Sequence, residues 1–105
     1  MNSFSATGRI SSRDLILRET NEGKQVLNFS IAMNRVGSDS ADFVSCTAFG
    51  KMAENIVKYS GTGLRVALRG RLCSDEYEKE GMKIYTNYIL VSEIEFIDFK
   101  KESEE

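Results

Sequence analysis

Hydrophobic and polar residues alternate over most of this 105-residue chain, a pattern typical of β-strands. The clearest case is residues 26–34, VLNFSIAMN, in which one face carries Leu27, Phe29, Ile31 and Met33. A weaker pattern over residues 4–13 is interrupted by a glycine. We predict further strands in residues 42–51, 64–74 and 82–98. In residues 64–74 the inward side chains should be those of Leu64, Val66, Leu68 and Leu72.

The hydrophobic period changes from two residues to that of a helix after Gly50. In the segment KMAENIVKYSG the apolar residues form one stripe, made of Met52, Ala53, Ile56, Val57 and Tyr59. This stripe predicts a single helix of about three turns. Gly61 follows it directly, and we expect this glycine to cap the helix C-terminus.

Five strands with one helix between the third and the fourth is the element order of an OB-fold. The sequence therefore predicts an all-β fold, a five-stranded Greek-key barrel with one short helix between strands 3 and 4. Gly8 and Gly70 lie inside strands and suit the bends or bulges that closure requires. An open α+β sheet with the helix on one face is the competing architecture. We expect one domain over residues 1–99 and a short, charged, disordered tail over residues 100–105.

Two phenylalanines face outward in the predicted strand DFVSCTAF. Val44, Cys46 and Ala48 form its inner side, because a narrow barrel interior accepts small residues. Phe43 and Phe49 then lie on the outer side together with hydroxyl side chains. Leaving a phenyl ring in water forgoes about 1.5 to 3 kcal/mol of transfer free energy, so a ligand or a partner should cover these rings.

Unpaired nucleic-acid bases are a ligand that suits such a surface. A base stacks on an aromatic ring for about 1 to 3 kcal/mol, and nearby Lys or Arg side chains neutralise the phosphates. Basic residues in or beside the same strands are the candidates for this role: Lys51, Arg9, Arg35, Arg69 and Arg71. The alternative is that the rings pack under a loop or in a dimer interface.

Charge is unevenly divided along the chain, although the net charge is only −2. Residues 1–71 carry ten Lys and Arg against six Asp and Glu, whereas residues 72–105 carry four against ten. We expect a polyanion to bind the first part, unless the division reflects only solvated faces of different sign.

Several classes of protein are disfavoured by what the sequence contains. The two cysteines have no CxxC spacing and there is no histidine, so we expect no Cys/His metal site, no cofactor and two reduced, packed thiols, Cys46 and Cys73. No apolar run is long enough for a membrane span, and no secretory signal is present. We expect a cytoplasmic protein that is not an enzyme. A metal-dependent nuclease using the carboxylates at 75–80 is disfavoured, because alternate residues of a hairpin point to opposite faces.

The chain resembles bacterial and phage single-stranded DNA-binding proteins along nearly its whole length. The matching segments, in order and spacing, are GRI (8–10), NFSIAMNR (28–35), DFVSCTAFGKMAENIVKYSGTG (42–63), LRGRL (68–72) and VSEIEFID (91–98). The resemblance implies that Phe43, Phe49 and Tyr77 stack on bases. It also implies a backbone contact for Lys51 and a place near the DNA path for Tyr59, whose position in the helical stripe favours packing instead.

The same resemblance implies sequence-nonspecific binding that protects single-stranded DNA in replication, recombination or repair. It further implies a homotetramer, with a dimer as the alternative, located in the cytoplasm at the nucleoid. Replication and repair proteins are further expected partners. Cellular members recruit such enzymes through an acidic C-terminal tip, and this chain ends at KKESEE without one.

The hairpin around Tyr77 departs from the family pattern. Asp75 and Glu76 precede this tyrosine where basic residues are common, and Glu78 and Glu80 follow it. A negative hairpin repels phosphates, so we expect weaker binding or a different strand path. Thr62 likewise replaces a residue that is often basic. An OB-fold interaction protein of the primosomal type, using the same face for protein contacts, is the alternative function.

Overall fold

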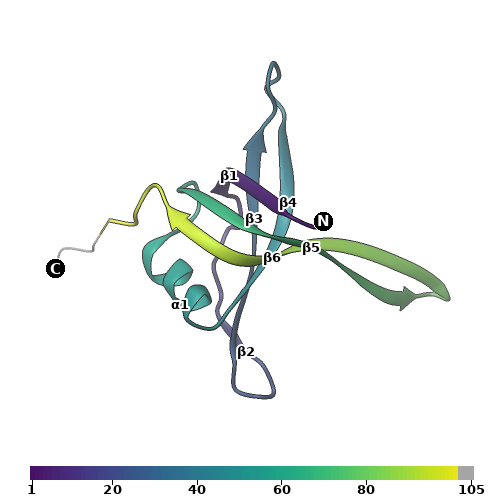
Figure 1. Cartoon of the computed structure of the whole chain (residues 1–105). Helices are drawn as coiled ribbons and strands as arrows, with labels where there is room; N and C mark the ends of the chain where they lie inside the picture. The colour runs from purple at the N-terminus through teal and green to yellow at the C-terminus, as the bar shows by residue number, and fades with distance from the viewer. Residues whose placement is uncertain (102–105) are drawn as a thin grey trace.

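The alternating segments form a sheet that closes on itself in the computed structural model, which describes residues 1–101 (Figure 1). In chain order the elements are β1 (Phe4–Ile10), β2 (Arg18–Glu19), β3 (Gln25–Asn34), β4 (Ala41–Phe49), α1 (Gly50–Tyr59), β5 (Arg65–Lys79) and β6 (Met82–Phe96). The five predicted strands and the helix are present, and the two-residue β2 is an addition that the sequence pattern did not indicate. Of the predicted tail, residues 102–105 lie outside the described residues.

The strand order in the sheet is β1-β5-β6-β4-β3-β2, and an additional β1–β3 pairing closes it. All pairings are antiparallel except β4–β6, which is parallel. This is the connectivity of the predicted OB-fold, and the fold class is confirmed. The open α+β alternative is wrong, because β1 pairs with both β5 and β3 and so leaves no open sheet.

Inward residues at alternate positions of the strands fill the interior, as the period-2 pattern predicted. Leu27 and Ile31 of β3 and Cys46 of β4 are buried almost completely. The helix α1 follows β4 directly and adds Ala53 and Ile56 to the same core. Burial of this stripe accounts for a short helix that would be marginal alone.

Glycines inside strands mark the places where two backbones approach closely. A Cβ at Gly8 would lie 2.7 Å from the carbonyl oxygen of Ala32, and one at Gly70 would collide with the carbonyl oxygen of Leu90. The β5–β6 register shifts between Arg69 and Gly70, so that Ser92 of β6 has no partner in the ladder. The predicted role of both glycines in closure is consistent with these contacts.

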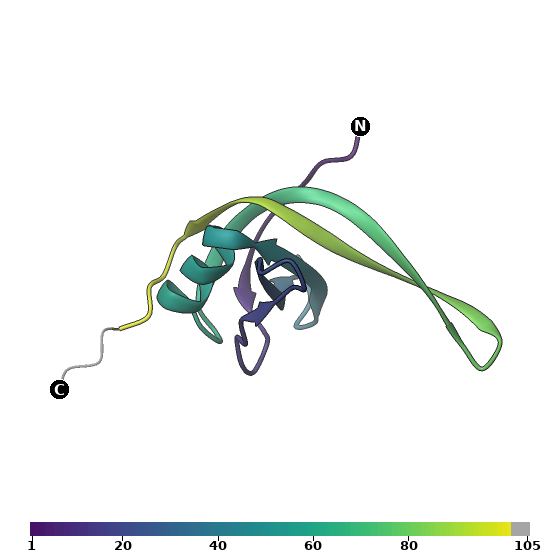
Figure 2. The ribbon, with the colours of Figure 1, turned by 90° about the horizontal axis from the view of Figure 1, so that it is seen from below.

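The β5–β6 hairpin projects far beyond the rest of the sheet (Figure 2). Its turn is formed by Glu80 and Gly81, which both have positive φ (54° and 79°), as a two-residue hairpin of type I′ requires. Leu72 was predicted to face the core, and this was wrong in part. Leu72 lies on the inner side of β5, but the hairpin extends beyond the barrel at this point, and Leu72 is 46% exposed.

The end of α1 also differs from the prediction. The C-cap is Ser60, with extended backbone, and the left-handed glycine of this connection is Gly63 rather than Gly61. Lys100, which was placed in the disordered tail, donates its backbone N–H to the Tyr59 carbonyl (2.8 Å). Within residues 1–101, no helix has the length and apolar character needed to cross a membrane.

Candidate nucleic-acid interface

The outer face of β4 carries the two exposed rings that the alternation predicted. The side chain of Phe43 is 70% exposed and that of Phe49 is 37% exposed, whereas Cys46 and Ala48 between them are buried. The two phenylalanines are six residue steps apart along β4, a distance of about 20 Å. Both rings therefore lie on the surface of the protein.

Neighbouring strands extend this outer face. Paired residues lie on the same side of a sheet, and Thr47 of β4 pairs with Leu90 of β6, which pairs with Arg71 of β5. Two-residue steps along the hairpin lead from this row to the Tyr77–Ile84 pair near its tip. The ring of Tyr77 is 49% exposed. We call this surface, marked by Phe43, Phe49, Tyr77 and Arg71, the aromatic face.

Two open grooves hollow the aromatic face. One, of about 500 Å³, lies beside Phe49 and is lined in part by Arg69, Arg71 and Leu90. The other, of about 420 Å³, lies between β3, β4 and the hairpin. Its polar lining includes Asn28, Ser30, Ser45, Thr47, Asp75 and Tyr88. One ring and two cations line the first groove, and hydrogen-bonding groups line the second.

The predicted cations on or beside this face differ in how far they are already paired. Lys51 and Arg71 are exposed, and neither forms an ion pair among the residues that the structure describes. Arg35 donates from Nε to Asp42 at 2.8 Å, and Arg69 donates from Nη1 to Glu93 at 3.2 Å. These pairs are exposed and therefore weak, so a phosphate can replace either carboxylate.

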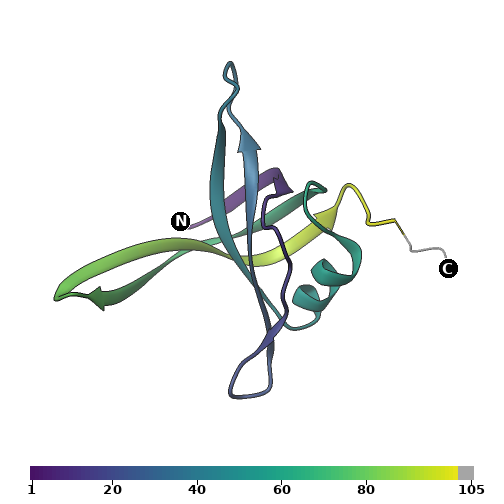
Figure 3. The ribbon, with the colours of Figure 1, turned by 180° about the vertical axis from the view of Figure 1, so that it is seen from behind.

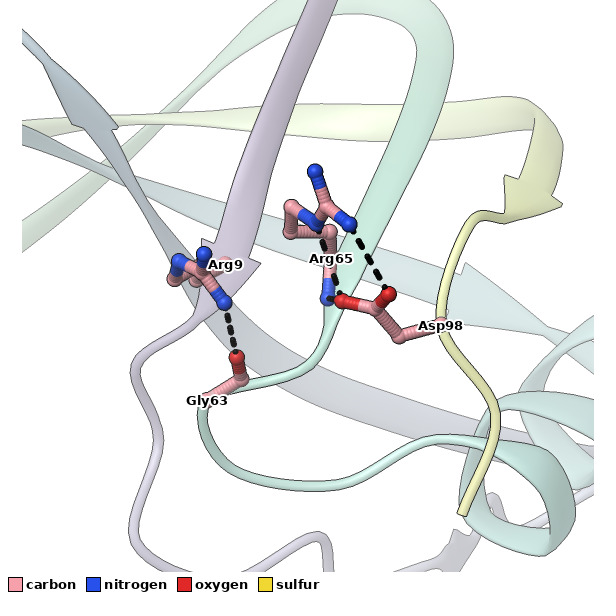
Figure 4. Close-up of polar contacts among 4 residues, drawn as sticks. All are labelled: Arg9, Gly63, Arg65 and Asp98. Atoms are coloured by element: carbon pink, nitrogen blue, oxygen red, sulfur yellow. Dashed lines mark hydrogen bonds and ion pairs between the residues drawn. The ribbon is translucent and has the colours of Figure 1, made fainter.

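Arg9 lies at the end of β1 (Figure 4), and it pairs with Ala32 of β3, which in turn pairs with Phe43 of β4. Its guanidinium donates to the carbonyl oxygen of Gly63 at 2.9 Å, and its register partner in β5 is Arg65. Arg65 precedes Arg71 by six residues of strand, which places Arg9 about 20 Å from the row that contains Arg71. Arg9 therefore lies at the other end of β5 from Arg71, two strands away from Phe43.

Asp98 organises that other end. Its carboxylate accepts hydrogen bonds from Nε and Nη2 of Arg65 at 3.0 and 3.1 Å, and from the Arg65 backbone N–H at 3.0 Å. The side-chain bond to Arg65, followed by the backbone bond, lowers the pKa of Asp98 to about 2. This cluster fixes the segment after β6 to the start of β5.

Tyr59 lies away from the aromatic face. Its ring is 6.0 Å from the ring of Phe96 and 6.4 Å from that of Phe99, measured between centroids. Figure 3 shows α1 and the C-terminal segment on the opposite side of the molecule from the hairpin. Packing, the alternative weighed for Tyr59, is what the geometry supports.

The hairpin is as acidic in space as it is in sequence. Asp75, Glu76, Glu78 and Glu80 are all exposed, and only Glu76 has a cationic partner in the described part of the hairpin, Lys83 at 3.4 Å. Asp75 lines the polar groove. Burial, together with the charge of Asp75, raises the pKa of Tyr88 in the same groove. Phosphates passing near Tyr77 therefore meet negative charge.

The two cysteines of the described chain are both free. Neither Cys46 nor Cys73 forms a disulfide, and burial raises the pKa of the Cys46 thiol to about 12, which keeps it protonated. Residues 1–101 contain no cluster of three or more Cys, Asp or Glu side chains placed to hold a metal ion.

Sequence reasoning missed two residues on these surfaces. Tyr85, 65% exposed, lies opposite Glu76 on the other face of the hairpin from Tyr77, and the alternation of β6 contained enough information to find it. The ammonium group of Lys24 stands 5.2 Å from the centroid of the Phe49 ring. No signal in the sequence indicates that Lys24 and Phe49 are close, because their proximity depends on the β3–β4 register.

Known proteins resemble this chain over most of its length. The model of the single-strand binding protein family matches residues 1–97. A protein of Fusobacterium nucleatum named single-stranded DNA-binding protein is 39% identical over 98% of this chain and 71% of its own length. Similar proteins from Staphylococcus aureus, named single-stranded DNA-binding protein 1, and from Clostridium perfringens, named single-stranded DNA-binding protein, are 36% and 35% identical. They are matched over 92% and 93% of this chain, which spans 65% and 67% of their lengths.

Proposed function

Because the chain belongs to the single-strand binding protein family and single-stranded DNA is thus its ligand, we propose that it holds this ligand by stacking bases on Phe43, Phe49 and Tyr77. The exposure of Phe43 and Phe49 on the outer side of β4 is the observation that carries the proposal. The exposed surface of each ring gains nothing from the protein core, and a base stacked on it gains about 1 to 3 kcal/mol.

The cations of the aromatic face supply the second part of the proposed mechanism. Lys51 and Arg71 contact phosphates directly, and Arg35 and Arg69 exchange their carboxylate partners for phosphates. Each such contact releases counterions, so affinity falls steeply as the salt concentration rises. Sequence preference is slight, because every base offers a ring face for stacking. Arg9, in the row of Phe43, can contact a phosphate beside that ring, whereas Tyr59 packs against Phe96 and Phe99.

Protection of single strands during replication, recombination or repair is the proposed role. It places the protein in the cytoplasm, at the nucleoid. The names of the family and of the relatives describe binding, which supports a binding protein rather than an enzyme.

Assembly into a homo-oligomer is a further part of the proposal. Residues 4–8 of β1 pair with β5 on one side, and in the described chain no strand pairs with them on the other. An unpaired strand edge is a template for pairing with a second copy. A dimer formed in this way can join another to make a tetramer with D2 symmetry, and the dimer alone is the alternative.

A second candidate function rests on the acidic hairpin. Exposed carboxylates at Asp75, Glu78 and Glu80 disfavour phosphates and suit a basic protein surface. In this case the aromatic face is covered by another protein, such as a replication or repair factor. This candidate corresponds to an OB-fold interaction protein of the primosomal type.

Titration with an oligo-dT separates the two candidates. We expect oligo-dT to bind tightly at low salt, a mixed-sequence duplex of equal length to bind much more weakly, and the oligo-dT affinity to fall as salt is added. Failure to bind oligo-dT at low salt, combined with binding of a replication protein, supports the second candidate instead. Molar mass from light scattering, with and without the oligomer, reports the assembly state in the same samples.

A further inference from the structure

Lys24 lies outside every segment that the family resemblance singles out, yet its ammonium group stands over the ring of Phe49. We propose that Lys24 is a further DNA-contacting residue, which binds the phosphate next to the base stacked on Phe49. This inference rests on the proposed function, because it requires that a base occupies this ring. The ring holds the ammonium group in place until DNA supplies a stronger anionic partner.

The turn between β2 and β3 fixes the backbone of Lys24. The Thr20 backbone N–H donates to the Lys24 carbonyl oxygen at 2.8 Å, and the Lys24 backbone N–H donates to the Thr20 Oγ1 at 3.1 Å. The Gly23 N–H donates to the Thr20 carbonyl oxygen at 2.9 Å, and Gly23 has the positive φ of 85° that this tight turn needs. Lys24 is therefore presented by a closed, hydrogen-bonded turn.

The strand register directs the Lys24 side chain onto the aromatic face. Val26 of β3 is paired with Phe49 of β4, so the two side chains lie on the same side of the sheet. Lys24 precedes Val26 by two residues and extends the same outer row. The contact between Lys24 and Phe49 thus follows from the register.

The charge of Lys24 is available to a ligand. Within residues 1–101 its ammonium group has no carboxylate partner at ion-pair distance, although Glu19 and Glu22 belong to the same turn region. A cation over an exposed ring is held weakly, whereas an ammonium–phosphate hydrogen bond is charge-assisted. A base that stacks on Phe49 brings its own phosphates within reach of a flexible lysine side chain.

The Lys24→Gln variant tests the inference through the salt dependence of oligo-dT binding. Loss of one phosphate contact should lower affinity at low salt and reduce the slope of log K against log salt by about 0.7. Lys24→Arg should restore most of the slope. Thermal melting of each variant, monitored by circular dichroism, confirms that the exposed substitution leaves the fold intact.

Lys58→Gln is the matched control. This substitution removes the same charge as Lys24→Gln. The Lys58 ammonium group stands 5.1 Å from the centroid of the Tyr59 ring, on the side of the molecule away from the aromatic face. The slope of log K against log salt for Lys58→Gln should equal that of the wild type. An equal reduction in both variants would show an effect of overall charge and overturn the inference.

Two other results also decide the matter. Tighter binding by Lys24→Gln at every salt concentration would mean that Lys24 only covers the ring and competes with the base, which contradicts the inference. Wild-type protein that fails to bind oligo-dT at low salt would overturn the proposed function and this inference together. These failures differ, because the first leaves wild-type binding intact.

Discussion

The side-chain amide of Asn2 exchanges two hydrogen bonds with the backbone of Leu72, both 2.8 Å long. The β1–β5 ladder ends at the pair Phe4–Gly70, so Asn2 continues the ladder by means of its side chain, at the point where the hairpin leaves the barrel. The base of the arm that carries Tyr77 is thereby tied to the N-terminal segment.

Asn2→Ala should loosen this attachment without unfolding the barrel. The Leu72 amide loses its acceptor, and we expect its hydrogen exchange to become markedly faster, while the amide of buried Val66 exchanges as before. The cost in unfolding free energy should be about 1 to 3 kcal/mol, the usual net value of two hydrogen bonds. Native-state exchange read by NMR checks both amides; unchanged protection at Leu72 would mean that the contact carries no weight in solution.

Phe49→Ala should weaken oligo-dT binding by about 1 to 3 kcal/mol and lower the unfolding free energy by much less than truncation of a core ring does. The reason is that its ring serves the ligand more than the core. Phe29→Ala is the matched comparison, because Phe29 is 4% exposed and its truncation should cost about 3 to 5 kcal/mol of stability. Urea denaturation and fluorescence titration give the two quantities. Equal destabilisation by both variants would place Phe49 in the core and remove it from the binding face.

Neutralising the hairpin should strengthen DNA binding. In the double variant Asp75→Asn, Glu78→Gln two carboxylates without cationic partners in the described structure are removed, so repulsion of phosphates near Tyr77 falls. We expect tighter oligo-dT binding at low salt, with the gain shrinking as salt screens the charges. The double variant Asp14→Asn, Glu54→Gln, which removes two exposed carboxylates outside the hairpin, controls for net charge. If the hairpin variant binds no better than this control, the strand passes away from the hairpin.

The bond between Arg65 and Asp98 predicts a pH dependence of stability. The pKa of Asp98 is lowered from 3.8 to about 2 in the folded protein, so its stabilising contribution is present above pH 3.8 and is lost as pH falls from there to about 2. Asp98→Asn should therefore have a lower urea midpoint than the wild type at neutral pH. The difference between the two proteins should narrow over the acidic window. A constant difference down to pH 2 would contradict the assignment.

Period-2 alternation was sufficient to predict the strands and the outward side of β4, because only two faces are available to a strand. It put Phe43 and Phe49 on the surface without any knowledge of their neighbours. It did not show where the barrel ends, and so Leu72 was expected to lie deeper than it does. Its exposure depends on the length of the hairpin beyond the closed sheet.

The positions of other candidates depend on pairing that the sequence does not state. Arg9 looked equivalent to Arg71, and only the strand registers show that it lies in the row of Phe43 and at the other end of β5 from Arg71. Tyr59 lies at the end of a helix, where the rings of Phe96 and Phe99 arrive from the far end of the chain. Lys24 was missed for the converse reason, since its ring partner is 25 residues away in sequence.

The most direct measurement of the central claim is ultraviolet cross-linking of the protein to oligo-dT, followed by mass spectrometry of the cross-linked peptides. Rings that stack on thymines should be the residues that become attached. We predict attachment at Phe43, Phe49 or Tyr77, and its loss at each site when that residue is changed to Leu. Attachment confined to Tyr59, Phe96 or Phe99, with none on the aromatic face, would contradict the account.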